Sequence, residues 1–151
     1  MRKLYKKIIT REESDSLLSF QGTCSYNSDP ILEFKRQDPV GALTFSWIID
    51  RILDKIKDDF SCNEISEYSY CFLCSSKEGH ELHQDVEFPI STSLLLEEPE
   101  SGGDIYYTDD KHGTNEMNID RDVYDLAVHT TDEWHGVKPS NGARKVFLLF
   151  I

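Results

Sequence analysis

Residues 134–150 read WHGVKPSNGARKVFLLF, an aromatic and polar segment, a turn, and then a run of mostly apolar residues. The Pro-Ser-Asn-Gly turn at 139–142 separates two segments that we expect to be β-strands. Successive side chains of a strand point to opposite faces, so alternation groups every second residue of the last segment. One face then carries Arg144, Val146, Leu148 and Phe150. This stretch predicts a strand with a single cation at the start of an apolar row.

Further strands are expected along most of the chain after Cys62, because its segments are rich in β-branched and aromatic residues and are separated by turn formers. The expected strands are 65–75, 88–96, 104–108, 123–130, 134–137 and 143–151.

Two helices are expected earlier in the chain, after a short opening strand at about 3–9. A Thr10–Glu13 capping box predicts a helix at 11–20, and apolar residues at three- and four-residue steps predict a long helix from Val40 to Phe60. Residues 21–30 resemble a loop. Helices followed by an all-β run indicate a mainly β fold with supporting helices, a sandwich or a barrel.

The size and charge of the chain limit the number of domains and the kinds of partner that we expect. Its 151 residues suffice for one domain, 1–151, with a core that needs no disulfide. The net charge of -12 opposes binding to a phosphate backbone, so no nucleic-acid partner is expected. We find neither a membrane-spanning apolar run nor a signal peptide, and we therefore expect no membrane association and a soluble, cytoplasmic protein.

His83 and Asp85 are the first candidate metal ligands. On an extended chain they point the same way while Gln84 faces away. The third ligand must come from a strand folded back alongside, and His135 is the best of the remaining histidines because it lies at a strand end. Two imidazoles and one carboxylate can hold one face of a ferrous ion and leave its other positions open. The pattern predicts a metal site made of these three residues.

The remaining histidines and the cysteines have simpler interpretations. His80 lies three residues before His83, not four apart on a helix as in zinc proteases, so we expect it to be a solvated loop residue. His112 lies in a polar turn, and His129 is expected on a strand as a core or rim residue. The Cys71–Cys74 C-x-x-C has no second pair to complete a zinc site, and reduced, half-buried thiols are expected rather than a structural or redox site.

Arg144 lies nine residues after His135. A buried arginine requires an anionic partner, and its planar fork fits a carboxylate bidentately. Lys145, on the opposite face, offers only a point charge. The spacing alone leaves two alternatives open: Arg144 binds an anionic co-substrate, or it forms a salt bridge with one of the many acidic residues.

The order and spacing of these residues resemble those of the 2-oxoglutarate and Fe(II)-dependent dioxygenases, and most closely those of the prolyl 4-hydroxylase-like branch. The resemblance covers about residues 63–151, with a weaker similarity before it. It rests on order and spacing: the His83-Gln84-Asp85 motif, the run 90–96 leading to the glycines of 100–105, the segment 134–137, and Gly142-Ala143-Arg144.

The resemblance implies a double-stranded β-helix, or jelly roll, with N-terminal helices packed on one sheet. It implies that His83, Asp85 and His135 bind Fe(II) and that Arg144 binds the distal carboxylate of 2-oxoglutarate, with O2 as second co-substrate and ascorbate as a candidate reductant. The expected reaction is hydroxylation of a C–H bond with release of succinate and CO2. Asp85 favours hydroxylation, since halogenating relatives carry a small residue there.

The chain departs from the family pattern at one co-substrate position. Family members usually carry a tyrosine before the first histidine, and Cys74 occupies its commonest spacing. Tyr70, Ser91 and Ser93 are the candidates for the missing hydroxyl, and Tyr70 and Ser93 are predicted to bind the co-substrate with Arg144.

The expected substrate is a prolyl residue of a peptide or protein. The alternatives are a free amino acid or another small metabolite, and a non-catalytic jelly-roll metal-binding or interaction module. Demethylases of alkylated nucleic acids carry a second arginine six residues after the first, where this chain has Phe150, and this argues against that branch.

Overall fold

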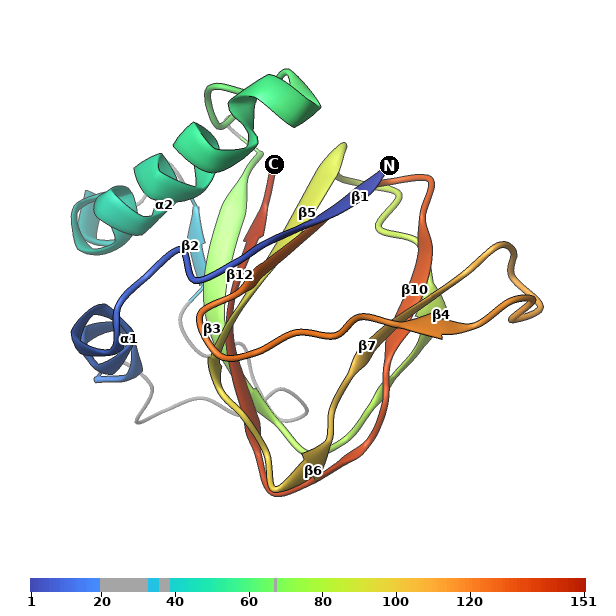
Figure 1. Cartoon of the computed structure of the whole chain (residues 1–151). Coiled ribbons are helices and arrows are strands. Elements are labelled where there is room, and N and C mark those ends of the chain that lie inside the picture. Colours follow the sequence, from blue (N-terminus) through green and yellow to red (C-terminus); the bar gives the residue numbers. More distant parts are fainter. Residues whose placement is uncertain (20–32, 36–38, 67) are drawn as a thin grey trace.

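The computed structural model describes residues 1–19, 33–35, 39–66 and 68–151; the loop expected at 21–30 lies outside them. Two helices and twelve strands are present in this part of the chain (Figure 1). In chain order they are β1 (Arg2–Tyr5), α1 (Arg11–Leu18), β2 (Glu33–Lys35), α2 (Pro39–Phe60), β3 (Tyr70–Ser76), β4 (His80–His83), β5 (Ile90–Glu97), β6 (Ser101–Gly102), β7 (Ile105–Thr108), β8 (Met117–Asn118), β9 (Leu126–Thr130), β10 (Trp134–Val137), β11 (Ser140–Asn141) and β12 (Arg144–Phe150).

Two facing sheets form the body of the molecule. The larger sheet has the order β1-β9-β5-β12-β3-β2 and the smaller one β4-β10-β7-β8, and β6 pairs with β11 between them. All neighbours are antiparallel, and from β3 onward the longer strands β3, β4, β5, β7, β9, β10 and β12 alternate between the two sheets. Figure 1 shows both helices on the outer face of the larger sheet, while the smaller sheet lies across the interior from it. This is the expected jelly roll with helices packed on one sheet.

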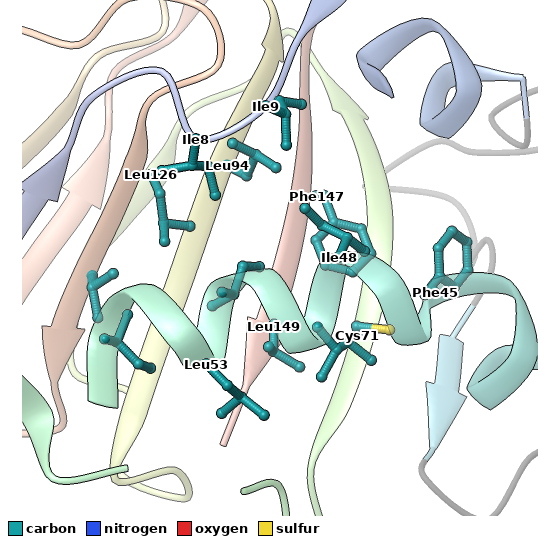
Figure 2. Close-up of a cluster of buried hydrophobic side chains, with 14 of the residues drawn as sticks. Ile8, Ile9, Phe45, Ile48, Leu53, Cys71, Leu94, Leu126, Phe147 and Leu149 are labelled. Carbon is teal, nitrogen blue, oxygen red and sulfur yellow. The ribbon is translucent and has the colours of Figure 1, made fainter. Parts of the chain in front are cut away.

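The main hydrophobic core lies between α2 and the larger sheet. The apolar face of α2 buries Phe45, Ile48 and Ile52 completely. The Phe45 ring packs 5.5 Å from that of Phe147 on β12 (Figure 2). Since Phe147 and Leu149 face the helix, the alternate residues of β12 must face the interior of the barrel. The periodicity that predicted α2 therefore also determines which side of β12 is available for a site. Among the described residues, neither helix is long and apolar enough to cross a membrane.

The capping box and both expected helices are confirmed, but several strand boundaries are shorter than expected. The first strand ends at Tyr5, because Lys7 adopts a left-handed conformation with φ 49°. The strand expected from residue 65, which is β3, begins at Tyr70, since Ser66 and Ser69 are hydrogen-bonded to each other in a local turn. The strand expected from 123 begins at Leu126, after Tyr124 with φ 73°. Side-chain pattern predicts strands better than it predicts backbone turns.

The β1–β9 end of the larger sheet is held by Asp125, whose side chain is fully buried. Its carboxylate accepts hydrogen bonds from the backbone amides of Lys7 at 2.8 Å and Asp122 at 3.0 Å, and it pairs with Lys6 Nζ at 2.9 Å. Burial opposes ionisation, but Lys6 and the two amides outweigh it, so the pKa of Asp125 lies below its ordinary value of 3.8.

We expect Asp125→Ala to lower the free energy of unfolding by about 3 kcal/mol, because two partly buried amides lose their acceptor. A carboxyl whose pKa is depressed by folding stabilises the protein above the unfolded pKa and loses this effect as the pH falls through the folded pKa. The difference between the two proteins should therefore shrink below about pH 4. Urea denaturation at neutral and acidic pH measures it, with the exposed Asp120→Ala as control. Equal unfolding of wild type and Asp125→Ala would contradict this role.

Candidate metal centre

The pairing of β4 with β10 brings two of the predicted ligands together. His83, at the end of β4, lies directly opposite His135 in the antiparallel register. Asp85 follows β4 after one residue, and Gln84 turns away from the site to donate to the backbone oxygen of Asp132 at 2.8 Å. Gly136, next to His135, leaves room for the side chain of Tyr106, since a Cβ at this position would lie 2.4 Å from the Tyr106 hydroxyl. The structure thus assembles all three predicted ligands from segments about fifty residues apart in sequence.

The donor atoms of these residues have the spacing that a metal ion requires. One donor atom each from His83, Asp85 and His135 lies within 4.8 Å of the other two. Asp85 Oδ1 is 3.3 Å from His83 Nε2, and Asp85 Oδ2 is 3.5 Å from His135 Nε2. For metal–ligand bonds about 2.1 Å long, ligand atoms at right angles lie about 3 Å apart. Two imidazoles and a carboxylate on one side are the donor set of a non-haem Fe(II) site.

Electrostatics favour an ionised Asp85 and a neutral His135, whereas the hydrogen bond with Asp85 raises the pKa of His83. Burial opposes the charge of Asp85, but hydrogen bonds from His129 and His83 outweigh it and hold the pKa of this carboxyl far below its usual range. Burial, and then the neighbouring His129, lower the pKa of His135 to about 3. Its imidazole is therefore neutral at physiological pH and has a lone pair to donate.

Arg144 lies on the wall of the pocket that also contains the three predicted ligands. It is the first residue of β12, is only 8% exposed, and shares the inner face of this strand with Leu148 and Phe150, as the alternation predicted. Ser93, on the neighbouring β5, lines the same pocket. Tyr70 does not line it; its ring stacks 5.0 Å from that of Phe150. Of the three predicted co-substrate residues, the structure brings Arg144 and Ser93 to the metal site and leaves Tyr70 outside.

Arg121 is a residue of this region that the sequence did not single out. Its Nη1 donates to the backbone oxygen and to Oγ of Ser93, at 2.9 and 3.0 Å. Arg121 lines a second pocket, and Arg144 belongs to the walls of both pockets. Burial, and then the charge of Arg144, lower the pKa of Arg121, but an arginine remains protonated at neutral pH. Because Ser93 Oγ accepts from Arg121, its own O–H can donate into the metal pocket.

Two other histidines also belong to the site. His80 was expected in a loop, and this is wrong: it lies on β4, and its exposed ring is 4.2 Å from that of His83 at the rim of the pocket. The polar residues of β4 give no strand pattern in the sequence, and the strand is defined by its backbone pairing with β10. His129 is on a strand and 5% exposed, as expected, but its Nε2 also lies 3.2 Å from Asp85 Oδ2. His112 is an exposed turn residue, as expected.

The C-x-x-C cysteines lie on opposite faces of β3. Cys71 packs under α2, whereas Cys74 packs inside the barrel against Leu95 and Val146. Three residues of extended chain reverse the side-chain direction, so the two sulfur atoms cannot bind one zinc ion. Both cysteines are free, but they are buried rather than half-buried as expected. Burial raises the pKa of Cys71 to about 12, which is typical of an unreactive thiol.

No protein-family model and no curated protein sequence matches the chain. Solved structures do. A prolyl-4-hydroxylase from Pseudomonas putida superimposes with a TM-score of 0.71 at 13% identity, over 99% of this chain and 86% of that one. A 2OG-Fe(II) oxygenase family oxidoreductase from Burkholderia pseudomallei gives 0.73 at 12% identity, over 99% and 82%. The chain has the fold of the 2-oxoglutarate/Fe(II) oxygenases.

A third match is a prolyl hydroxylase from Trichoplax adhaerens in complex with a peptide fragment of the hypoxia-inducible factor oxygen degradation domain. Its TM-score is 0.71 at 14% identity, over 99% of this chain and 82% of that one. These similarities establish the jelly-roll fold. What the chain does has to be argued from its own site.

Proposed function

We propose that this chain is an Fe(II)- and 2-oxoglutarate-dependent dioxygenase that hydroxylates a prolyl residue of a peptide or protein and releases succinate and CO2. One observation carries the proposal: His83, Asp85 and His135 share a single pocket with Arg144. Bound Fe(II) would supply the oxidative chemistry with O2 and 2-oxoglutarate. The residues of the chain bind, orient and shield the reactants.

Each polar residue of the pocket has a defined task in this proposal. His83, Asp85 and His135 hold the metal from one side and leave the opposite side open. Arg144 binds the distal carboxylate of 2-oxoglutarate through its planar fork. Ser93 donates its hydroxyl proton to the same carboxylate, because its oxygen already accepts from Arg121. Ser93 thus provides the hydroxyl for which the sequence offered several candidates.

The apolar wall of the pocket supports a prolyl substrate. Phe150 lines the pocket and packs against three further aromatic rings: Tyr70 at 5.0 Å, Phe88 at 5.3 Å and Phe72 at 5.9 Å. All four side chains are only partly buried. A partly exposed aromatic surface suits a compact apolar ring such as pyrrolidine. The Trichoplax structure, a prolyl hydroxylase with a bound peptide, agrees with this choice of substrate.

The test is a peptide and metabolite screen with Fe(II), 2-oxoglutarate and ascorbate. We expect a proline-containing peptide to gain the mass of one oxygen atom with stoichiometric succinate release, and the same peptide with alanine for proline to gain none. Modification of a free amino acid or metabolite instead would replace the peptide assignment with the small-molecule alternative.

A second measurement separates an enzyme from a binding module. Anaerobic titration with Fe(II) and 2-oxoglutarate should develop the visible charge-transfer band of the chelated keto acid. A protein that binds the metal but never 2-oxoglutarate would be a metal-binding module, and the proposed function would fail.

A further inference from the structure

A chain of two hydrogen bonds leads from the predicted metal ligand Asp85 into the core. Asp85 Oδ2 lies 3.2 Å from Nε2 of His129, and Nδ1 of His129 lies 2.9 Å from the hydroxyl of Tyr107. Tyr107 comes from β7 and His129 from β9, and they are 1% and 5% exposed. The three residues thus belong to segments that are distant in sequence. The bond between Tyr107 and His129 is buried, and the bond between His129 and Asp85 is partly buried.

The chemistry of Asp85 fixes the direction of its bond with His129. An ionised carboxylate can only accept, so Nε2 of His129 must carry a proton and donate it to this bond. The other ring nitrogen, Nδ1, pairs with the hydroxyl of Tyr107 at 2.9 Å. Tyr107 therefore holds the His129 ring with Nε2 directed at Asp85.

The contact with His129 differs from the other histidine contacts of Asp85. His83 and His135 are predicted to direct Nε2 to a metal ion, and an Nε2 atom bound to metal no longer donates to Asp85. His129 keeps its bond, because its ring is held by Tyr107 and packs 4.0 Å from that of His135. His129 occupies one lone pair of Oδ2, so Oδ1, which faces His83, is the oxygen with both lone pairs available to a metal ion.

We propose that Tyr107 and His129 are positioning residues that hold the Asp85 carboxylate in place as a one-oxygen metal ligand. The inference rests on the proposed function, since it takes Asp85 to be a ligand. Chelation by both oxygens would occupy one of the positions that a facial site keeps open for its reactants. Partners of this kind behind a metal ligand typically contribute about 10- to 100-fold to metal affinity.

The experiment measures metal affinity without turnover. Mn²⁺ or Co²⁺, which do not require anaerobic handling, are titrated into the protein, and quenching of Trp134, beside His135, reports binding. We expect Tyr107→Phe, which removes only the hydroxyl, to weaken binding about tenfold. In a His129→Gln background the amide donates without help from Tyr107, so adding Tyr107→Phe should change the affinity less than about twofold. Co²⁺ absorption spectra should show an altered coordination geometry in the single variant.

The control is Tyr106→Phe, the neighbour on the same strand, which should leave both affinity and spectrum unchanged. Unaltered metal binding in Tyr107→Phe, or an equal loss in both backgrounds, would overturn the inference. Complete loss of binding in His129→Gln would make His129 a ligand instead and would also overturn it. Failure of the wild-type protein to bind metal at all would sink the proposed function, so the two failures are distinguishable.

Discussion

Replacing Asp85 with alanine is expected to abolish succinate release and to weaken Fe(II) binding by more than about 100-fold. Loss of an outer partner of a metal site costs about 10- to 100-fold in affinity, and Asp85 is a predicted ligand and the only anion among the three. Its removal also leaves the Nε2 atoms of His83, His129 and His135 facing one another without the carboxylate that they all contact. His83→Ala should abolish succinate release for the same reason. Anaerobic Fe(II) titration and a succinate assay measure the two effects.

The neighbouring Gln84→Ala is the matched control for this prediction. Gln84 points away from the site and bonds to the backbone of Asp132, so its loss should leave Fe(II) affinity within about twofold of wild type. Thermal unfolding should accompany both measurements, because a variant that melts early loses metal for another reason. An Asp85→Ala protein that folds, binds Fe(II) normally and releases succinate would show that the metal site lies elsewhere.

The parts of this site that could be predicted from sequence depend on local rules. Alternation along one strand places Arg144 with Leu148 and Phe150 on the inner face of β12, and it directs His83 and Asp85 to the same side. The capping box of Thr10 and Glu13 is equally local, and the structure contains both of its hydrogen bonds.

The parts that could not be predicted depend on which strands become neighbours. His129 and His135 are six residues apart, yet β9 pairs with β5 in the larger sheet while β10 crosses to the smaller one. His129 on the larger sheet then meets Asp85 and His135 because the two sheets face each other across the pocket. Arg121 lies in a connection without periodicity, and its bond to Ser93 joins positions 28 residues apart. The short strands β6, β8 and β11 likewise owe their existence to pairing rather than to pattern.

Arg144→Ala is expected to raise the KM for 2-oxoglutarate by at least about 100-fold, because a charge-assisted hydrogen bond contributes about 1.5–3 kcal/mol and the arginine fork makes two. Metal affinity should change little, since no predicted ligand is removed. Arg144→Lys keeps the charge but loses the fork, and an intermediate increase of about tenfold is expected. Lys145→Ala is the control: this neighbour faces outward and pairs with Glu97 at 2.9 Å, and its loss should leave the KM within about twofold of wild type.

A second co-substrate shows whether Arg144 contacts the distal carboxylate itself or only contributes positive charge to the pocket. A 2-oxo acid with a methyl group in place of the distal carboxylate cannot use Arg144, so wild type and Arg144→Ala should use it with similar, low efficiency. The preference of the wild type for 2-oxoglutarate over this analogue should then nearly vanish in the variant, because the coupling between one side chain and one ligand group disappears when either is removed. A preference that survives in Arg144→Ala would mean that another cation holds the carboxylate. Arg121 is then the residue to replace next, because it lines the adjoining pocket and already bonds to Ser93.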